Sequence, residues 1–280
     1  MSLSYGGLCT KFAIYRIEIM KKTIFSLLGS VAFIIAKAQI SPPGLGRDTN
    51  VGSWSALGIK KQLNEEGTKK SLAYIGVGNT SEPNNDNPFS KNSILILNYE
   101  MYRDFAPNHQ YTYAVSYSRK NEYSDEAPYN KEGVRQEFKI YARYSYTLKP
   151  FNRWKWKNTL RQEVRKFYDA DFNNADETLQ LRTRVKAQLT YALSSKNNQK
   201  LHFGAEAFFS TGYKISAEPS YWSPFQYKET RYTFFYSFDI PSAALTLDIG
   251  YMNNQVRNNP KAKYGVHYAA IDLIWNLPYR

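Results

Sequence analysis

The sequence predicts an all-β fold, an antiparallel transmembrane β-barrel of about twelve strands within a range of ten to fourteen. Three observations lead to this prediction. Apolar and polar residues alternate with a period of two along many stretches, and the connections between these stretches alternate between short and long. The mean hydropathy of the chain is −0.57, and beyond the N-terminal region no run of about 20 apolar residues could form a membrane-spanning helix. We therefore expect the chain to cross a membrane with strands.

The N-terminal region resembles a secretory signal peptide preceded by an extension. From Met20, the segment MKKTIFSLLGSVAFIIAKAQ has two lysines, an apolar stretch and the small-x-small sequence Ala36-Lys37-Ala38. We interpret residues 20–38 as the signal peptide, cleaved near Ala38, and residues 1–19 as an upstream extension of the start. The alternative is that residues 1–19 form a genuine N-terminal tail. The only cysteine, Cys9, lies in this extension, so we expect no disulfide in the secreted chain.

The composition favours strands and argues against a nucleic-acid partner. The chain has 24 Tyr and 16 Phe, which suit half-buried strands and membrane interfaces because the tyrosine ring is apolar while its hydroxyl stays hydrated. Beyond residue 38, 32 basic and 23 acidic residues leave a net charge of +9. The cations are distributed along strand faces rather than clustered, and a secreted chain rarely meets nucleic acid, so we expect no nucleic-acid partner.

The longest alternating stretch covers residues 177–193. One register is apolar from Leu179 to Leu193 apart from Thr183, and the other carries three successive cations, Arg182, Arg184 and Lys186. A period of two over 17 residues excludes an amphipathic helix, and at about 3.3 Å per residue this strand is about 55 Å long. Strands in globular proteins usually end at about 10 residues. We therefore expect part of this strand to extend beyond the membrane.

The same alternation predicts eleven strands, and we expect no helix after the signal peptide. Each strand has one apolar or aromatic register and one polar register. In chain order the strands and the apolar residues that define them are 53–63, 71–79 and 93–103; 110–120, with Tyr111, Tyr113, Val115 and Tyr117; 134–148, with Phe138, Ile140, Ala142 and Tyr144; 154–167, with Trp154, Trp156, Leu160 and Val164; 177–193; 201–209, with Leu201, Phe203 and Ala205; 229–240, with Tyr232, Phe234 and Tyr236; 244–255; and 264–277.

The connections between these strands differ in length at the two ends of the barrel. Short turns at one end and long loops at the other are typical of outer-membrane barrels, and in lipid the barrel must close to pair every backbone group. The loops are rich in Asn, Asp, Pro and Gly, and no linker divides residues 53–280, which we predict to form one barrel domain. The short connections are 104–109, 149–153, 194–199 and 241–243, and the long ones are 80–92, 121–133, 168–176, 214–228 and 256–263.

The strand count leaves the segment 39–52 unassigned. If the connection 194–199 faces the periplasm, alternation places the start of the first strand at the outer end. An even count then needs one more strand before residue 53, where the sequence ISPPGLGRDTN is a poor strand. Either residues 39–52 thread through the barrel, or they pair weakly, or the count of eleven is wrong.

Alternation alone does not decide which face of each strand meets lipid. A secreted lipocalin-like or sandwich protein would have the same pattern, with Leu and Val inside and the charges outside. The three successive cations on the 177–193 strand and the unequal loop lengths favour a membrane barrel. We therefore predict that the apolar register faces lipid and that the charged register faces the lumen.

Several of these stretches resemble a known family. The sequences EGVRQEFKIYARYSYTL, LRQEVRKF and LQLRTRVKAQLTYAL, after an early strand with Trp54, resemble the domain-of-unknown-function 2490 (DUF2490) family of secreted barrel proteins of Gram-negative bacteria. The similarity covers about residues 51–280 and depends on the arrangement of strands and a loose Arg-Gln pattern. It implies a barrel in the bacterial outer membrane, and it carries over no catalytic residue.

We find no catalytic, metal or cofactor site in the sequence. A barrel phospholipase needs a serine activated by a histidine, and the His-x-Ser-Asn-Gly sequence of such enzymes is absent. The three histidines are His109 in a turn, His202 on an inward register and His267 near the last long loop, and only His267 with a loop serine could serve a lipid hydrolase. No histidines are spaced as metal ligands; the loop acids near Asp169 could bind Ca²⁺ only speculatively. We therefore expect a non-enzymatic protein without a cofactor.

The strongest constellation is a ladder of charges on the lumen-facing register. Lone buried cations are costly, so these charges either pair with acids and fill the lumen or line a channel for anionic solutes or acidic oligosaccharides. A structural or adhesive barrel and a membrane-embedded lipid hydrolase are the other classes. We expect outer-membrane lipid as a partner, anionic small solutes if the lumen is open, and the barrel-assembly machinery during biogenesis. The ladder consists of Arg135, Glu137, Lys139, Arg143, Lys155, Lys157, Arg161, Glu163, Arg165, Arg182, Arg184, Lys186, Glu206, Glu229 and Arg231.

Overall fold

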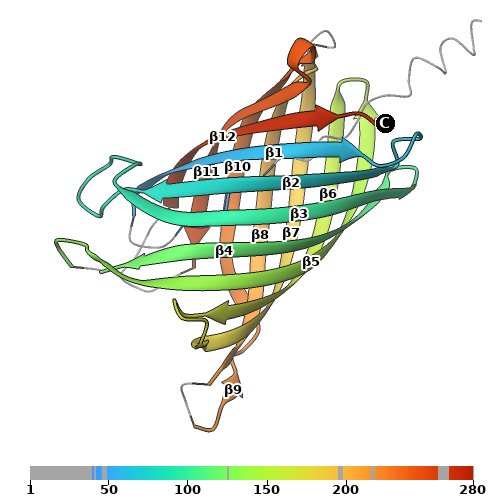
Figure 1. The fold of residues 1–280 in the computed structure, drawn as a ribbon. Coiled ribbons are helices and arrows are strands. Elements are labelled where there is room, and N and C mark those ends of the chain that lie inside the picture. Colours follow the sequence, from blue (N-terminus) through green and yellow to red (C-terminus); the bar gives the residue numbers. More distant parts are fainter. Residues whose placement is uncertain are drawn as a thin grey trace, which may run out of the picture. The chain divides into compact units, whose positions relative to one another are not determined.

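Eleven strands close into a barrel, and a two-residue strand, β9, pairs with the end of β8 outside the ring (Figure 1). The predicted all-β barrel of about twelve strands is therefore confirmed. The strands are β1 (Val51–Gln62), β2 (Lys69–Thr80), β3 (Lys91–Ala106), β4 (His109–Tyr123), β5 (Lys131–Phe151), β6 (Trp154–Tyr168), β7 (Asn174–Ser194), β8 (Gln199–Lys214), β9 (Tyr221–Trp222), β10 (Gln226–Ile240), β11 (Leu245–Val256) and β12 (Gly265–Leu277).

The computed structural model describes residues 40, 42–45, 49–124, 126–194, 198–215, 218–257 and 265–279. Within these ranges the only helical element is a 3-10 turn at Pro241–Ala243, and none is long and apolar enough to cross a bilayer. The predicted signal peptide, its cleavage site near Ala38, the extension 1–19 and Cys9 lie outside the described residues.

The barrel closes through a parallel pair, whereas every other neighbouring pair of strands is antiparallel. β1 runs parallel to β12, from Val51 opposite His267 to Lys61 opposite Leu277. Eleven strands that alternate in direction bring the first and the last strand to the seam in the same direction, so closure must be parallel there. The sheet is therefore mixed rather than wholly antiparallel, and in the described residues no further strand precedes β1.

The two ends of the barrel carry connections of different length. At the end that we call the short-turn end, β3 and β4 are joined by residues 107–108, and β5 and β6 by residues 152–153. Asn108 adopts a positive φ of 67°, a conformation that asparagine tolerates in tight turns. At the opposite end, which we call the long-loop end, residues 81–90 join β2 to β3. The predicted connection 104–109 is shorter than expected because β3 continues to Ala106.

One half of the lumen, lined by β1–β3 and β10–β12, holds a cluster of large apolar side chains beside buried polar residues such as Lys60, Asp248 and Asp272. Trp54, Leu72, Phe235, Met252 and Tyr268 are almost fully buried and belong to five different strands. The Trp54 indole also donates a hydrogen bond to Asp272, at 3.0 Å. Gly76 faces this indole so closely that a Cβ there would overlap the ring, so glycine is required for the packing.

The described residues ahead of β1 belong to no strand, and all of them except the exposed Asn50 are buried or half-buried against the barrel interior. Ile40, Leu45 and Thr49 are buried. The Leu45 N–H donates to the Tyr268 hydroxyl at 3.2 Å, and the Ser93 hydroxyl donates to the Leu45 carbonyl at 3.2 Å. Of the alternatives for this segment, placement inside the lumen is the one that the described residues follow.

Candidate functional site

The second half of the lumen is polar, and all fifteen residues of the predicted ladder lie on its inner register, on β5–β8 and β10. The outer register of the same strands is apolar: Ile140 and Val185 are 58% and 50% exposed, whereas Arg184 between such positions is 8% exposed. The pleat of a strand turns successive side chains to opposite faces, so the charges gather inside.

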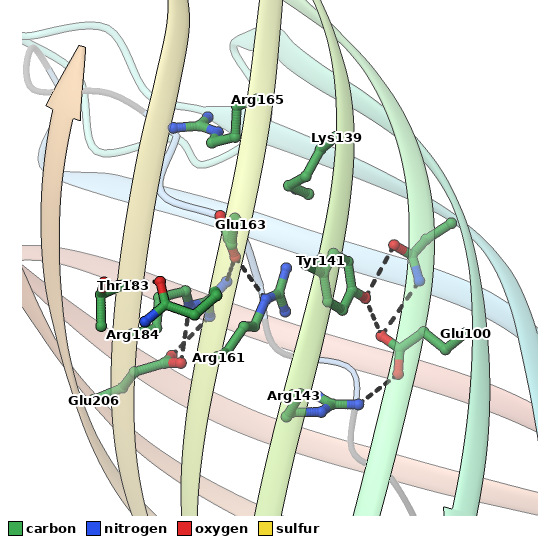
Figure 2. A network of polar contacts seen from close by, with 12 residues as sticks. Glu100, Lys139, Tyr141, Arg143, Arg161, Glu163, Arg165, Thr183, Arg184 and Glu206 are labelled. Atoms are coloured by element: carbon green, nitrogen blue, oxygen red, sulfur yellow. Dashed lines mark hydrogen bonds and ion pairs between the residues drawn. The ribbon is translucent and has the colours of Figure 1, made fainter.

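The centre of the polar half is a group of ion pairs around Glu163 (Figure 2). Its carboxylate forms an ion pair with Arg161 at 2.6 Å and accepts a hydrogen bond from Arg184 at 3.0 Å, and its side chain is 1% exposed. The Arg184 guanidinium also binds both oxygens of Glu206, with Nε–Oε1 at 2.9 Å and Nη2–Oε2 at 2.8 Å. Such two-pronged pairs are among the strongest polar contacts in proteins. Three strands, β6, β7 and β8, are thereby joined inside the barrel.

A second group of ion pairs is centred on Glu137, nearer the long-loop end. Arg165 binds its carboxylate through Nε at 2.8 Å and Nη2 at 2.7 Å, and the Lys139 ammonium lies 3.5 Å away. Arg165 also donates to the amide oxygen of Gln180. Because Glu137 and Glu163 each have two cationic partners, the energetic cost of burying their carboxylates is offset locally.

Arg231 connects the polar half to the N-terminal segment. Its guanidinium forms an ion pair with Glu229 and donates to the Pro42 carbonyl at 3.1 Å. Asn254 donates to the other Glu229 oxygen at 3.3 Å, and Gly44 lies against the Arg231 and Asn254 side chains. The segment is therefore held by charged side chains as well as by the apolar residues around Leu45.

Sequence reasoning missed Glu100 on β3, which forms a third buried ionic group. Arg143 donates to it at 2.6 Å, and the Tyr141 hydroxyl also donates to its carboxylate (Figure 2). The Tyr102 hydroxyl is a further donor to the same carboxylate. Tyr141 reaches Glu100 across the intervening strand because the residue between them in the register is the small Ala114. The alternation of polar residues on β3 could have indicated that Glu100 faces the lumen. The sequence of β3 alone, however, does not show that its partners lie on β5.

Aromatic rings support the guanidinium groups by stacking. The Cζ atom of Arg161 lies 3.4 Å from the centroid of the Tyr141 ring, and Arg184 and Arg231 lie 4.4 and 4.2 Å from that of Phe208. Phe208 is fully buried between these two arginines. A cation over a ring face gains electrostatic stabilisation while its N–H groups, which point outward in the guanidinium plane, remain free for carboxylates.

Several ladder cations form no ion pair with a carboxylate in the described part of the chain. Arg135 and Arg182 each contact a phenylalanine ring, and their Nε atoms are buried without a hydrogen-bond partner there. Nearer the short-turn end, the Lys157 ammonium donates to the Gln110 amide at 3.3 Å. The cations thus fall into two groups, one neutralised by buried acids and one not.

A cavity of about 390 Å³ lies in the polar half toward the long-loop end. Its lining includes eight Lys or Arg side chains and five Glu side chains, together with Pro43 and Gly44 of the N-terminal segment. Glu163 and Arg184 line the part that is deepest in the barrel, whereas Lys120 and Glu122 line the part beside the loop between β4 and β5. The cavity therefore extends from the long loops to the central ion pairs.

The three histidines lie apart and bind neighbouring polar groups. His109 and His267 hydrogen-bond with the hydroxyls of Tyr144 and Tyr251, at 2.7 and 2.5 Å, and His202 with Thr190 at 2.9 Å. Among the described residues no group of three His, Cys, Asp or Glu side chains could hold a metal ion. The loop acid Asp169 accepts hydrogen bonds from Asp171 and Asn173, both at 2.9 Å, so its carboxylate is directed at its own loop.

Comparison with known proteins identifies a family. A family model described as "Protein of unknown function (DUF2490)" matches residues 51–265, and no curated protein matches the chain. One similar solved structure is the Pseudomonas aeruginosa FpvA–pyoverdine complex, at 13% identity and a TM-score of 0.29, covering 76% of this chain and 39% of that one.

A second similar structure is the ferripyoverdine receptor of the P. aeruginosa outer membrane, at 12% identity and a TM-score of 0.29, covering 80% of this chain and 40% of that one. The chain thus spans about two fifths of the proteins it matches. Superpositions at a TM-score of 0.29 are too loose to carry an argument about this chain.

Proposed function

We propose, from the premise that this chain belongs to the DUF2490 family, that it is a non-enzymatic barrel of the bacterial outer membrane with a packed lumen. The family's description assigns no activity, so the proposal depends on the barrel interior. The observation that carries it is the buried group Glu163, Arg184 and Glu206, which links the neighbouring strands β6, β7 and β8 inside the polar half of the lumen.

The outer surface supports residence in a lipid bilayer. Large apolar side chains on different strands point away from the lumen, and Leu57, Val115 and Ile140 are 61%, 56% and 58% exposed. Monomeric soluble proteins rarely expose apolar surface that continues from strand to strand. Lipid would cover this surface. In lipid every backbone N–H and C=O group needs a partner within the protein, and a closed barrel supplies these partners. With the expected signal peptide at 20–38, it supports delivery by the barrel-assembly machinery and an outer-membrane location.

The interior supports a packed barrel over a wide channel. One half of the lumen holds large apolar side chains, including Trp54 and Tyr268, beside buried polar ones, and the described part of the N-terminal segment lies beside them. In the other half, the acids of the ladder are bound to guanidinium groups at 2.6–3.0 Å. An open diffusion channel would instead present solvated charges around a water-filled core. A packed barrel would act through its outer loops or its surface.

Membrane fractionation and planar-bilayer recording test this proposal. We expect the mature chain in the outer membrane, with a folded form that migrates differently on gels before and after heating. We expect no steady conductance from the purified protein in a planar bilayer. A soluble periplasmic protein would contradict the location, and a stable conductance would contradict the packed lumen.

An anion-selective channel is the second candidate, and one observation favours it. Arg135 and Arg182 line the cavity without a carboxylate partner among the described residues, so their charge is available to a passing anion. Conductance that favours anions, with a preference that declines as salt screens the cations, would support this candidate over the packed barrel.

A further inference from the structure

The cavity at the long-loop end combines an excess of positive charge with hydrogen-bond donors that the protein leaves unused. Of its basic lining residues, Arg165, Arg184 and Arg231 are engaged by Glu137, Glu163 and Glu229. Eight basic against five acidic side chains leave a formal excess of three positive charges around about 390 Å³. Charge of one sign along a recessed site attracts and concentrates ligands of the opposite sign.

Arg182 is the first unused donor, and Ser210 is its neighbour across the β7–β8 ladder. The Arg182 Nε atom and the Ser210 hydroxyl are both buried without a hydrogen-bond partner among the described residues, and both residues line the cavity. Ser210 is 1% exposed. Buried polar atoms in native proteins are nearly always hydrogen-bonded, so two adjacent exceptions beside a cavity indicate a place where a ligand supplies the acceptor.

Arg135 is the second unused donor, and an aromatic ring holds it in place. Its Cζ atom lies 4.1 Å from the centroid of the Phe167 ring, and its Nε atom is buried without a partner in the described residues. Stacking uses the face of the guanidinium and leaves the N–H groups at its edge available. Arg165 also stacks on Phe167, at 4.8 Å, but its N–H groups are already bound to Glu137. Of the two guanidinium groups that stack on Phe167, only that of Arg135 therefore has N–H groups without a carboxylate partner in the described residues.

We propose that this cavity is a binding site for a small solute carrying a phosphate or carboxylate group, held by Arg135 and Arg182. A guanidinium fork matches two oxygens of such a group, and the Ser210 hydroxyl adds a donor beside Arg182. A volume of about 390 Å³ lies at the small end of the range of ligand pockets, about 300–1,000 Å³, which favours a compact anion over a polymer. The site goes beyond the packed-barrel function, because binding from the long-loop end requires no passage through the lumen.

The test is a titration of the purified full-length protein, folded in detergent, with inorganic pyrophosphate and with citrate at low, matched ionic strength. We expect saturable heat release in calorimetry and a rise in the unfolding temperature. The double substitution R135Q/R182Q should reduce the affinity at least tenfold. The matched control K155Q/K157Q removes the same charge from two inward lysines that do not line the cavity, and it should retain most of the affinity.

Two outcomes would overturn the proposal. One is wild-type protein that shows no saturable binding of either anion. The other is an equal loss of affinity in the two double variants, which would mean a general effect of net charge. If R135Q/R182Q does not fold, R135K/R182K decides, because lysine keeps the charge but lacks the planar fork. We then expect at least a tenfold weaker affinity, and an unchanged affinity would refute the site. The measurement is made in detergent, so it stands apart from membrane location and from conductance.

Discussion

Replacement of Arg184 by methionine should destabilise the barrel far more than removal of an unpaired lumen cation. Arg184 binds both Glu206 oxygens, at 2.9 and 2.8 Å, and Glu163 at 3.0 Å. Its loss leaves the Glu206 carboxylate, 9% exposed, without this partner and leaves Glu163 with Arg161 alone. Breaking a buried pair by removing one partner costs about 3–5 kcal/mol, because the remaining charge stays buried.

The double substitution Arg184→Met with Glu206→Met should cost much less than Arg184→Met alone. It removes both members of the two-pronged pair, and Glu163 keeps its 2.6 Å contact with Arg161. Replacement of a whole buried ion pair by apolar side chains of similar volume is often close to neutral. We therefore expect the second substitution to restore about 2 kcal/mol or more of the stability lost in the first.

Urea titration of the protein folded into lipid vesicles measures these differences, with heat-modifiable gel mobility as the readout of the folded fraction. Lys155→Met is the matched control, because Lys155 lies on the inner register and has no ion pair in the described residues. We expect the control to change the unfolding free energy by less than 1 kcal/mol or so. If Arg184→Met costs no more than the control, or if the double variant is less stable than the single, the account of the lumen as a mutually neutralising network is wrong.

Three further predictions follow from packing and face assignment. Val185→Arg should lower the free energy of unfolding in vesicles by up to about 2–4 kcal/mol, because it places a charge in lipid. Gln188→Arg, on the inner register, should have a milder effect. Equal effects would mean that the faces are misassigned. Gly76→Val should lower the urea midpoint, because its side chain would overlap the Trp54 ring, while Gly133→Ala, where a Cβ meets no close neighbour, should change it little. Leu45→Ala should destabilise by about 2–5 kcal/mol if the N-terminal segment packs stably in the lumen, and an unchanged urea midpoint would show that it does not.

The described part of the N-terminal segment is held at the long-loop end, where β1 begins. Pro42 and Leu45 contact inward side chains near the long-loop ends of β3, β10 and β12. These contacts cover the inner face of the barrel next to the start of β1.

The sequence by itself determined the strands and the two faces of each strand. Alternation with a period of two is a local property, because the pleat turns neighbouring side chains to opposite sides whatever the strand pairs with. For that reason the strand from Glu177 to Leu193, and the position of Arg184 on the face opposite Leu181, could be predicted from these residues alone. Placing that face inside also needed the unequal loop lengths. The unequal connections, likewise local, predicted the two unlike ends.

Only the tertiary structure decided which partners these faces meet. The register places Arg161 directly opposite Arg184 and Lys139 directly opposite Arg165, and these like charges repel. A nearby carboxylate binds both members of each pair, Glu163 for the first and Glu137 for the second. A slip of two residues would leave the faces unchanged and rearrange the ion pairs between strands, so no local pattern specifies the pairing. The contact of Arg143 with Glu100 passes over a whole strand, and β1 and β12 meet across more than 200 residues of chain. These contacts depend on closure of the barrel, which brings together residues whose positions along the chain are unrelated.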